Sequence, residues 1–220
     1  MERITKDLVE KYRPIVHDLM IRGYFPYETV HISFFVSKDP EAQEQLLGVL
    51  DHILMEELSL LARRAEDEQI IGVAINKINT KLPPGEVSYF EHLIAEKVTN
   101  ASARAVVDFM TDDDCKVDLF EEMNVDRIVE IMCLCVLPEA RGAGVGKALM
   151  SATEALARQL NIPALSAYFT ADSSQAIAKA AGFQDFLVYP HSKCIYKGVP
   201  ISEYLRDDQQ CTKLCGKILT

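Results

Sequence analysis

The region between residues 127 and 160 restricts the fold of this chain more than any other part of its sequence. The apolar run RIVEIMCLCVL leads into the glycine-rich segment PEARGAGVG, and a helical pattern follows, with one apolar face made by Leu149, Ala152, Leu156 and Leu160. A continuous apolar run is typical of a strand that is covered on both faces. The run PALSAYF predicts a second strand after the helix. This order of strand, helix and strand predicts a right-handed crossover between two parallel strands.

The rest of the sequence predicts further helices and strands, which together make one mixed α/β domain over residues 1–220. No internal repeat or low-complexity segment interrupts them. In the first part of the chain, we expect a helix from Leu8 to about Gly23 that Pro14 kinks or delays, an aromatic loop over 23–40 and a helix over 41–58. LSLLARR and IIGVAINKI should then form a β-hairpin, followed by helical pieces over 88–123 that break near Thr111. Toward the C-terminus, we expect a short helix, SSQAIAKAAGF, and a last pair of strands, FLVYP and CIYKG.

The charge balance and the apolar runs exclude several classes of protein. With 23 Lys and Arg against 33 Asp and Glu, the net charge of -10 argues against binding to nucleic acid, which needs a basic face. The N-terminal MERITKDLVEKYR lacks the apolar segment of a signal peptide, and no later run reaches the length that spans a membrane. We therefore expect a soluble, cytoplasmic monomer without membrane or nucleic-acid partners.

The six cysteines are expected to be reduced thiols rather than a disulfide framework or a metal site. Cys133 and Cys135 are two apart in the apolar run and would share one face of a strand. Cys211 and Cys215 are four apart, on what the spacing suggests is a helix. Neither pair has the C-x-x-C spacing of a zinc site or a neighbouring histidine. The acidic residues 112–114 are more typical of a helix start than of a metal cluster, so we expect no metal.

The glycines between the expected strand and helix suit an anion. The first N–H groups of a helix lack intrahelical acceptors and carry a partial positive charge, and glycine removes the Cβ atoms that would keep a phosphate away. Two familiar phosphate loops do not fit. A P-loop needs glycine where Arg141 stands and Ser or Thr where Ala148 stands, and the spacing G-x-G-x-G departs from the G-x-G-x-x-G of dinucleotide-binding folds.

A third phosphate loop does fit, because RGAGVG over residues 141–146 matches R/Q-x-x-G-x-G/A, the acyl-CoA pyrophosphate loop of the GNAT superfamily of N-acetyltransferases. The stretches LFEEMNVDRIVEIMCLCVLPEARGAGVGKAL and FTADSSQAIAKAAGF resemble the insect arylalkylamine N-acetyltransferase-like branch of that superfamily. The segment FPYETV resembles the F-x-D-E-P-L segment of the branch, with Tyr27 in place of Asp and Thr29 in place of Pro.

This resemblance implies an α/β GNAT fold, in which helices flank a single mixed, twisted β-sheet and the acyl-CoA site lies where the central strands splay apart. It also implies acetyl-CoA as the co-substrate. The residues that it places along the cofactor are Leu134, Cys135 and Val136 on the strand, Arg141, Gly142, Ala143, Gly144, Val145, Gly146 and Lys147 in the loop and helix start, and Thr170 and Ser173 after the next strand.

For the proton that the amine must lose, the resemblance implies Glu28, which matches the glutamate of the F-x-D-E-P-L segment. A carboxylate is a poor base unless burial raises its pKa or water shares the proton. Without the resemblance, Glu28 is a solvated loop residue. Asp39 in SKDP is the reserve candidate, although it is better placed to cap the helix that begins at Pro40.

Two hydroxyl groups follow the strand PALSAYF at positions where the branch has serines. Thr170 departs from that pattern and Ser174 keeps it, and both are candidate catalytic residues. Ser173 or Ser174 would equally serve as a helix cap. Ala180 replaces the tyrosine that many acetyltransferases use as general acid, which excludes a phenol there. His191 lies in a C-terminal loop that the family uses near the amine, and is otherwise an ordinary surface histidine.

The reaction implied is acetyl transfer from acetyl-CoA to the primary amine of a small molecule, by direct attack on the thioester. The amine is an arylalkylamine such as dopamine, serotonin or tyramine, or a polyamine or agmatine-like amine. The aromatic residues near Glu28 suit the first class, and the negative net charge suits the second. Two alternatives remain open at this point: a peptide or protein N-terminal acetyltransferase, and a catalytically silent acyl-CoA-binding module.

Overall fold

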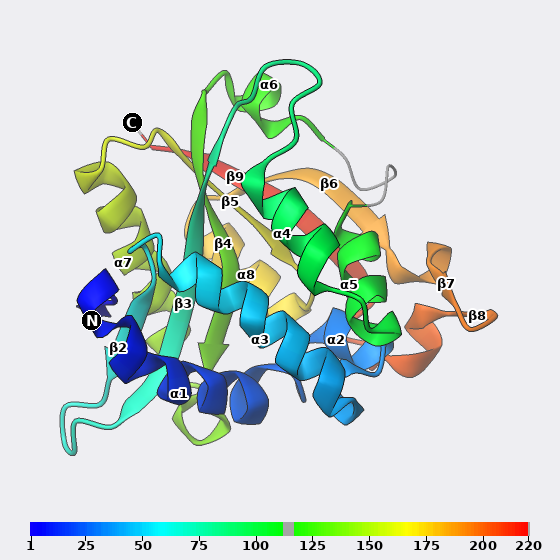
Figure 1. Ribbon diagram of the computed structural model, residues 1–220, viewed down its shortest axis with the longest axis horizontal. Coiled ribbons are helices and arrows are strands. Elements are labelled where there is room, and N and C mark those ends of the chain that lie inside the picture. Colours follow the sequence, from blue (N-terminus) through cyan, green and yellow to red (C-terminus); the bar gives the residue numbers. More distant parts are fainter. Residues whose placement is uncertain (112–116, 220) are drawn as a thin grey trace.

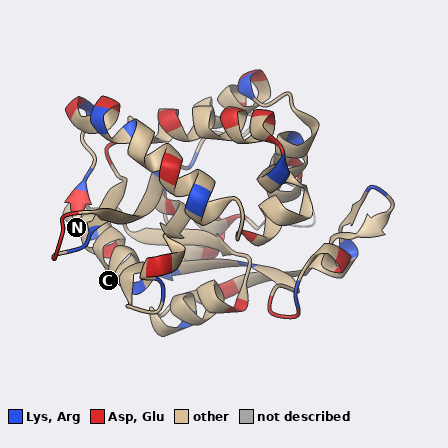
Figure 2. Ribbon diagram, turned by 90° about the horizontal axis from the view of Figure 1, so that it is seen from below, with Lys and Arg blue, Asp and Glu red and all other residues tan. Residues whose placement is uncertain are grey.

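The computed structural model describes residues 1–111 and 117–219. The expectation of an acidic helix start at residues 112–114 lies outside the described residues. None of the helices in the described ranges is both long enough and apolar enough to cross a bilayer. Along the outer helices, Lys and Arg are interspersed with Asp and Glu (Figure 2).

Within the described residues, seven strands form one mixed sheet, which confirms the predicted fold class. β4 and β5 run parallel, and the other neighbouring strands run antiparallel. The predicted hairpin is β2 and β3, and the helix between β4 and β5 is the predicted one that follows the glycines. From one edge to the other, the strands are β1 (Glu2–Arg3), β2 (Leu60–Arg63), β3 (Ile70–Thr80), β4 (Arg127–Val136), β5 (Ala164–Phe169), β9 (Cys211–Ile218) and β6 (Gln184–Pro190).

Helices cover both faces of the sheet (Figure 1). Their bounds are α1 (Val9–Leu19), α2 (Thr29–Ser33), α3 (Pro40–Leu54), α4 (Tyr89–Lys97), α5 (Ala101–Thr111), α6 (Leu119–Met123), α7 (Val145–Gln159) and α8 (Asp172–Ala180). α1, α3, α4 and α5 pack with β3 and β4 in the largest apolar core, whereas α7 and α8 pack on the opposite face. The sheet is therefore buried on both sides at its centre, as the continuous apolar run of β4 predicts.

The first helix leads the chain toward the centre of the sheet. Its buried residues Val9, Tyr12, Val16 and Leu19 keep helical spacing, so one face of α1 packs on the core. The helix begins well before Pro14, so the expectation of a later start is wrong. A π-helical turn, η2 (Met20–Tyr24), extends α1 to the predicted end near Gly23.

The central strands separate at one end, and this opening positions the site. β4 pairs with β3 along its whole length, from Arg127 to Val136. It pairs with β5 only at Val129 and Glu130. Beyond that point the rest of β4 has no strand partner on its β5 side among the described residues, which leaves backbone groups free to bind another molecule.

Three expectations about local structure are wrong. The aromatic loop contains α2, a helix of five residues that is too short to leave a period in the sequence. CIYKG contributes β7 (Ile195–Tyr196), which pairs with β8 (Val199–Pro200) in a small separate hairpin and not with β6. Cys211 and Cys215 lie on a strand, β9, and not on a helix. β9 fills the gap between β5 and β6, a long-range pairing that residue spacing alone does not reveal.

Candidate active site

The glycine loop after β4 leaves room and donors for an anion. Gly142 and Gly144 have φ values of 80° and 81°, in the left-handed region that favours glycine, and Gly144 is the N-cap of α7. A Cβ atom at either position would meet no protein atom within 4 Å. The first helical bond runs from the Ala148 N–H to the Gly144 oxygen, at 3.0 Å. The N–H groups from Gly142 to Lys147 precede it and have no acceptor within the described residues. This cradle fits a pyrophosphate.

Another glycine, which the sequence reasoning missed, brings this cradle close to the sheet. A Cβ at Gly72 of β3 would lie 2.8 Å from the Cys135 oxygen and 3.4 Å from the Val145 side chain. Only glycine therefore allows α7 to begin against this part of the sheet without displacing β4. In the sequence, a glycine inside an otherwise apolar strand could have indicated this close approach of the backbone.

Arg141 connects the glycine loop to the segment after α1. Its Nε donates to the Val136 oxygen at 3.0 Å, and its Nη2 donates to the Gly23 oxygen at 2.8 Å. Its guanidinium also lies 4.1 Å from the ring centre of Tyr27. Through these contacts, Arg141 holds the glycine loop against the segment that follows α1. The phosphate contact expected from the sequence remains a prediction.

The predicted strand residues lie on the two faces of the unpaired part of β4. Leu134 and Val136 are half-buried on the side of α7, whereas Cys133 and Cys135 are buried on the side of α1. The Cys135 thiol donates to the Leu19 oxygen at 3.3 Å. Burial raises the pKa of both thiols to about 12, so neither is a thiolate near neutral pH.

Glu28 and Thr170, which the sequence reasoning selected separately, are hydrogen-bonded to each other. They are 142 residues apart, and the Thr170 hydroxyl donates to Oε1 of Glu28 at 2.6 Å. Glu28 is the N-cap of α2, and its Oε2 accepts the backbone N–H of His31 at 2.8 Å and a short hydrogen bond with His31 Nδ1. We call Glu28, His31 and Thr170 the Glu28 cluster. Its members are buried or nearly so, which corrects the view of Glu28 as a solvated loop residue.

The electrostatics of the Glu28 cluster favour an ionised carboxylate. Burial alone raises the pKa of Glu28, but the charge that His31 carries when protonated and the hydrogen bonds from His31 and Thr170 outweigh it, so the pKa is lowered. Burial, together with Cys133 of β4 and Glu28, raises the pKa of Tyr24, and Glu28 also contributes to the raised pKa of Cys133, so the cluster and this part of β4 are close enough to interact. His31 was missed in the sequence because α2 was not recognised as a helix.

The other candidate residues are engaged elsewhere. The Ser174 hydroxyl donates to the Ala171 oxygen at 2.8 Å, and Ser173 is exposed. Ala171 is the N-cap residue of α8, and the Ser174 hydroxyl accepts its backbone N–H at 3.4 Å as part of a capping box, so Ser174 serves as a helix cap as expected. Asp39 caps α3 as expected, by accepting the Ala42 N–H at 3.0 Å.

His191 is not a surface histidine, because it is fully buried. Its Nδ1 lies 2.8 Å from the Gln209 oxygen, and its Nε2 lies 2.8 Å from the Thr212 hydroxyl. Burial lowers the pKa of its ring, which favours a neutral imidazole. His191 therefore holds the turn η6 (His191–Lys193) against the start of β9.

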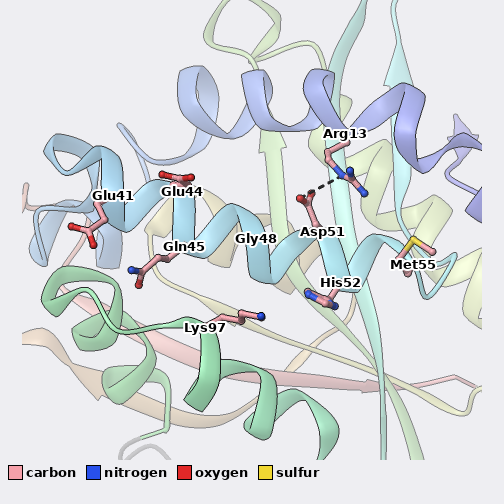
Figure 3. A pocket seen from close by; sticks show the side chains of 9 residues that line it. All are labelled: Arg13, Glu41, Glu44, Gln45, Gly48, Asp51, His52, Met55 and Lys97. Carbon is pink, nitrogen blue, oxygen red and sulfur yellow. Dashed lines mark ion pairs between the residues drawn. The ribbon is translucent and has the colours of Figure 1, made fainter.

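A hollow on the outer side of α3 does not coincide with these groups (Figure 3). It has a volume of about 660 Å³. Arg13 and Asp51 form an ion pair in its wall, and Lys97 extends from α4 on the other side. None of its lining residues belongs to the glycine loop or to the Glu28 cluster. No group of three or more His, Cys, Asp or Glu side chains in the described ranges is arranged to hold a metal.

Residues 22–183 match the sequence model of the Acetyltransferase (GNAT) family, and the chain belongs to this family. The match contains the glycine loop, the Glu28 cluster and the unpaired part of β4. The family uses acetyl-CoA, which agrees with the cradle of free N–H groups. No curated protein sequence matches the chain.

Solved structures with the same fold cover nearly the whole chain. Arylalkylamine N-acetyltransferase 2 from Aedes aegypti has a TM-score of 0.82 at 20% identity, with 96% of each chain covered. The mosquito arylalkylamine N-acetyltransferase like 5b has a TM-score of 0.70 at 20% identity, over 99% of this chain and 98% of the other. A polyamine N-acetyltransferase from Drosophila melanogaster has a TM-score of 0.65 at 15% identity, over 95% and 96%. At these identities the likeness shows a common fold.

Proposed function

We propose that this protein transfers the acetyl group of acetyl-CoA to the primary amine of a small molecule, by direct attack of the amine on the thioester. One observation carries the proposal. A phosphate cradle, an unpaired stretch of strand and a buried carboxylate with two partners meet where β4 and β5 separate. These are the groups that bind acetyl-CoA, hold its thioester and accept a proton.

The chemistry assigns a task to each of these groups. An alkylammonium with a pKa near 10.4 is neutral in only about one molecule in 2,500 at pH 7, so a proton must be removed before nitrogen can attack. The Glu28 cluster supplies the proton acceptor. The unpaired backbone of β4 offers donors for the oxyanion that forms at the thioester carbon. The N–H groups from Gly142 to Lys147 hold the pyrophosphate and so fix the position of the reacting carbon.

Two classes of amine fit the surroundings of the Glu28 cluster. The rings of Tyr24 and Phe25 lie 5.2 and 5.3 Å from the ring of His31, which supports an arylalkylamine. The net charge of -10 supports a polyamine or agmatine-like dication. The solved structures of the same fold include named arylalkylamine and polyamine N-acetyltransferases.

A thiol-release assay with acetyl-CoA and a panel of aryl, aliphatic and dicationic amines tests the proposal. We expect CoA release with at least one class. Glu28→Gln should lower kcat/KM by about 10²- to 10⁴-fold at pH 7, the usual cost of disabling general base catalysis. The control is Asp39→Asn, which removes a carboxylate from the same segment but outside the cluster and should keep most of the rate. Turnover with no amine, or a crippled Asp39→Asn beside an active Glu28→Gln, would refute this assignment.

A further inference from the structure

The two ring nitrogens of His31 have different surroundings. Nδ1 is hydrogen-bonded to the Glu28 carboxylate, which accepts but cannot donate when ionised, so Nδ1 carries a proton. In the neutral ring, Nε2 then carries the lone pair. Nε2 has no hydrogen-bond partner within the part of the chain that the structure describes, and it is not among the fully buried unpaired atoms there, which are Arg13 Nε and Asn76 Oδ1. Part of its surface is therefore accessible to solvent.

We propose that His31 Nε2 is the atom that takes the proton from the amine, and that Glu28 and Thr170 position the imidazole. This assignment rests on the proposed acetyl transfer and deepens it, because it names the base within the Glu28 cluster. His31 is then a catalytic residue, and Glu28 and Thr170 are positioning residues. The arrangement is a chain of hydrogen bonds from Thr170 through Glu28 to His31.

The hydrogen bonds of Glu28 explain why the carboxylate is not itself the base. Its Oε2 accepts two N–H groups of His31, and its Oε1 accepts the Thr170 hydroxyl. These donors stabilise the anion and leave little basicity for the amine proton. Imidazole in water titrates near pH 6.5 and a glutamate near 4.3, so the imidazole is about 100-fold the stronger base before those donors are counted.

The proton and electron transfers balance as follows. His31 Nε2 takes one proton from the ammonium group, which gives a neutral amine and an imidazolium that Glu28 stabilises. The nitrogen lone pair attacks the thioester carbon, and the carbonyl electrons move to its oxygen. When the carbonyl re-forms, the C–S bond breaks and the CoA thiolate leaves. The thiolate takes the second proton from the nitrogen, which yields the amide and CoA thiol, and the imidazolium returns the first proton to water.

The titratable and polar groups around His31 come from several elements. Glu28 faces Nδ1 from the start of α2, and the Tyr24 ring faces the imidazole from η2. The Glu28 carboxylate also interacts with Thr170, which follows β5. Its electrostatic neighbours include Cys133 and His191. Glu28 is the one member of this set that holds a negative charge near neutral pH, because burial raises the pKa values of Tyr24 and Cys133.

The test compares wild type with His31→Asn, in which the amide can replace Nδ1 as donor to Glu28 but offers no base at Nε2. The matched control is His17→Asn. His17 also pairs with a carboxylate, Asp51, at 2.8 Å, but this pair lies between α1 and α3, outside the Glu28 cluster. Acetyl-CoA binding by titration calorimetry shows that each variant is folded. His31→Ala with added imidazole provides a second, independent measurement.

At pH 7.5, His31→Asn should lower kcat/KM for 2-phenylethylamine by about 10²- to 10⁴-fold. For trifluoroethylamine, which is already neutral at this pH, the loss should be less than about tenfold. The ratio of wild-type to variant rates cancels the ionisation of the amine, and it should fall as the pH is lowered, because a protonated imidazole cannot accept a proton. Imidazole should restore activity to His31→Ala.

Three results would count against this role. Equal rates for wild type and His31→Asn, or the same loss for both amines, would exclude His31 as the base and leave acetyl transfer intact. Failure of imidazole to restore any rate to a folded His31→Ala would do the same. A wild-type protein that binds acetyl-CoA but acetylates no amine would instead overturn the proposed function, and this assignment with it.

Discussion

At the residue scale, the buried cysteines bear on whether the acetyl group passes through the protein. Cys133 and Cys135 lie on the unpaired part of β4, and burial raises the pKa of each to about 12. At pH 7 only roughly one thiol in 10⁵ would be a thiolate, and the thiolate is the nucleophile. These cysteines therefore pack the core, and we expect that they do not carry the acetyl group.

We predict that neither thiol gains an acetyl group when the protein is mixed with acetyl-CoA in the absence of amine. Intact-protein and peptide mass spectrometry within one turnover time measures this directly. Iodoacetamide provides the reference, because it should label the partly exposed Cys194 and Cys211 well before the two buried thiols. A rapid mass gain of one acetyl group on Cys133 or Cys135 would establish a covalent intermediate and contradict direct attack.

Individual residues also show which features of the site can be predicted from the sequence alone. Glu28 and Thr170 could be selected from their places in motifs, but their hydrogen bond could not, since it joins positions 142 residues apart. His31 left no signal, because the five residues of α2 make less than two turns and no apolar period. The burial of His191 was equally invisible, because its two partners lie on a later strand and turn.

At the scale of elements, the start of α7 combines a helix N-terminus with two glycines in the left-handed region. We predict that Gly144→Glu weakens acetyl-CoA binding at least tenfold, about 1.4 kcal/mol, because the new side chain fills the cradle and adds negative charge. Isothermal titration measures the affinity. Arg141→Ala should weaken it less, because two of its N–H groups are directed at backbone oxygens of Val136 and Gly23.

The control for strain is Gly198→Glu in the β7–β8 hairpin. Gly198 has a φ of 85° and, like Gly144, no atom within 4 Å of an added Cβ. Both substitutions therefore force the same left-handed conformation, at a cost of about 1–2 kcal/mol. Only the variant at Gly144 should lose affinity. Unchanged binding by a folded Gly144→Glu would remove the loop from the acetyl-CoA site.

At the scale of the whole molecule, the site is assembled from segments that are far apart in the chain. The turn after α1, the unpaired part of β4 and the end of β5 meet at the opening between β4 and β5. The strand–helix–strand order and the glycine loop were predictable, because each leaves a local pattern. The opening itself was not, because it depends on how β9 and β3 flank the two central strands.

The pH dependence of folding is also a property of the whole molecule, and His191 gives it a defined contribution. Burial lowers the pKa of this ring in the folded protein below its ordinary value of about 6.5. Between those two values the unfolded chain binds more protons than the folded one, so the free energy of unfolding falls as the pH drops through about 6.5. The stability that the neutral ring contributes is therefore fully present above this pH.

We predict that His191→Asn is less stable than wild type at pH 7.5, by about 1–3 kcal/mol, since it leaves Thr212 or Gln209 without a partner. This difference in the free energy of unfolding should shrink as the pH is lowered to 5. Only wild type loses stability over this range, because its buried imidazole resists the protonation that occurs readily in the unfolded chain. Urea unfolding at pH 7.5, 6.5 and 5 measures both effects. His92→Asn, at an exposed position, is the control and should follow wild type. A difference between His191→Asn and wild type that stays constant with pH would show that the ring does not titrate on unfolding.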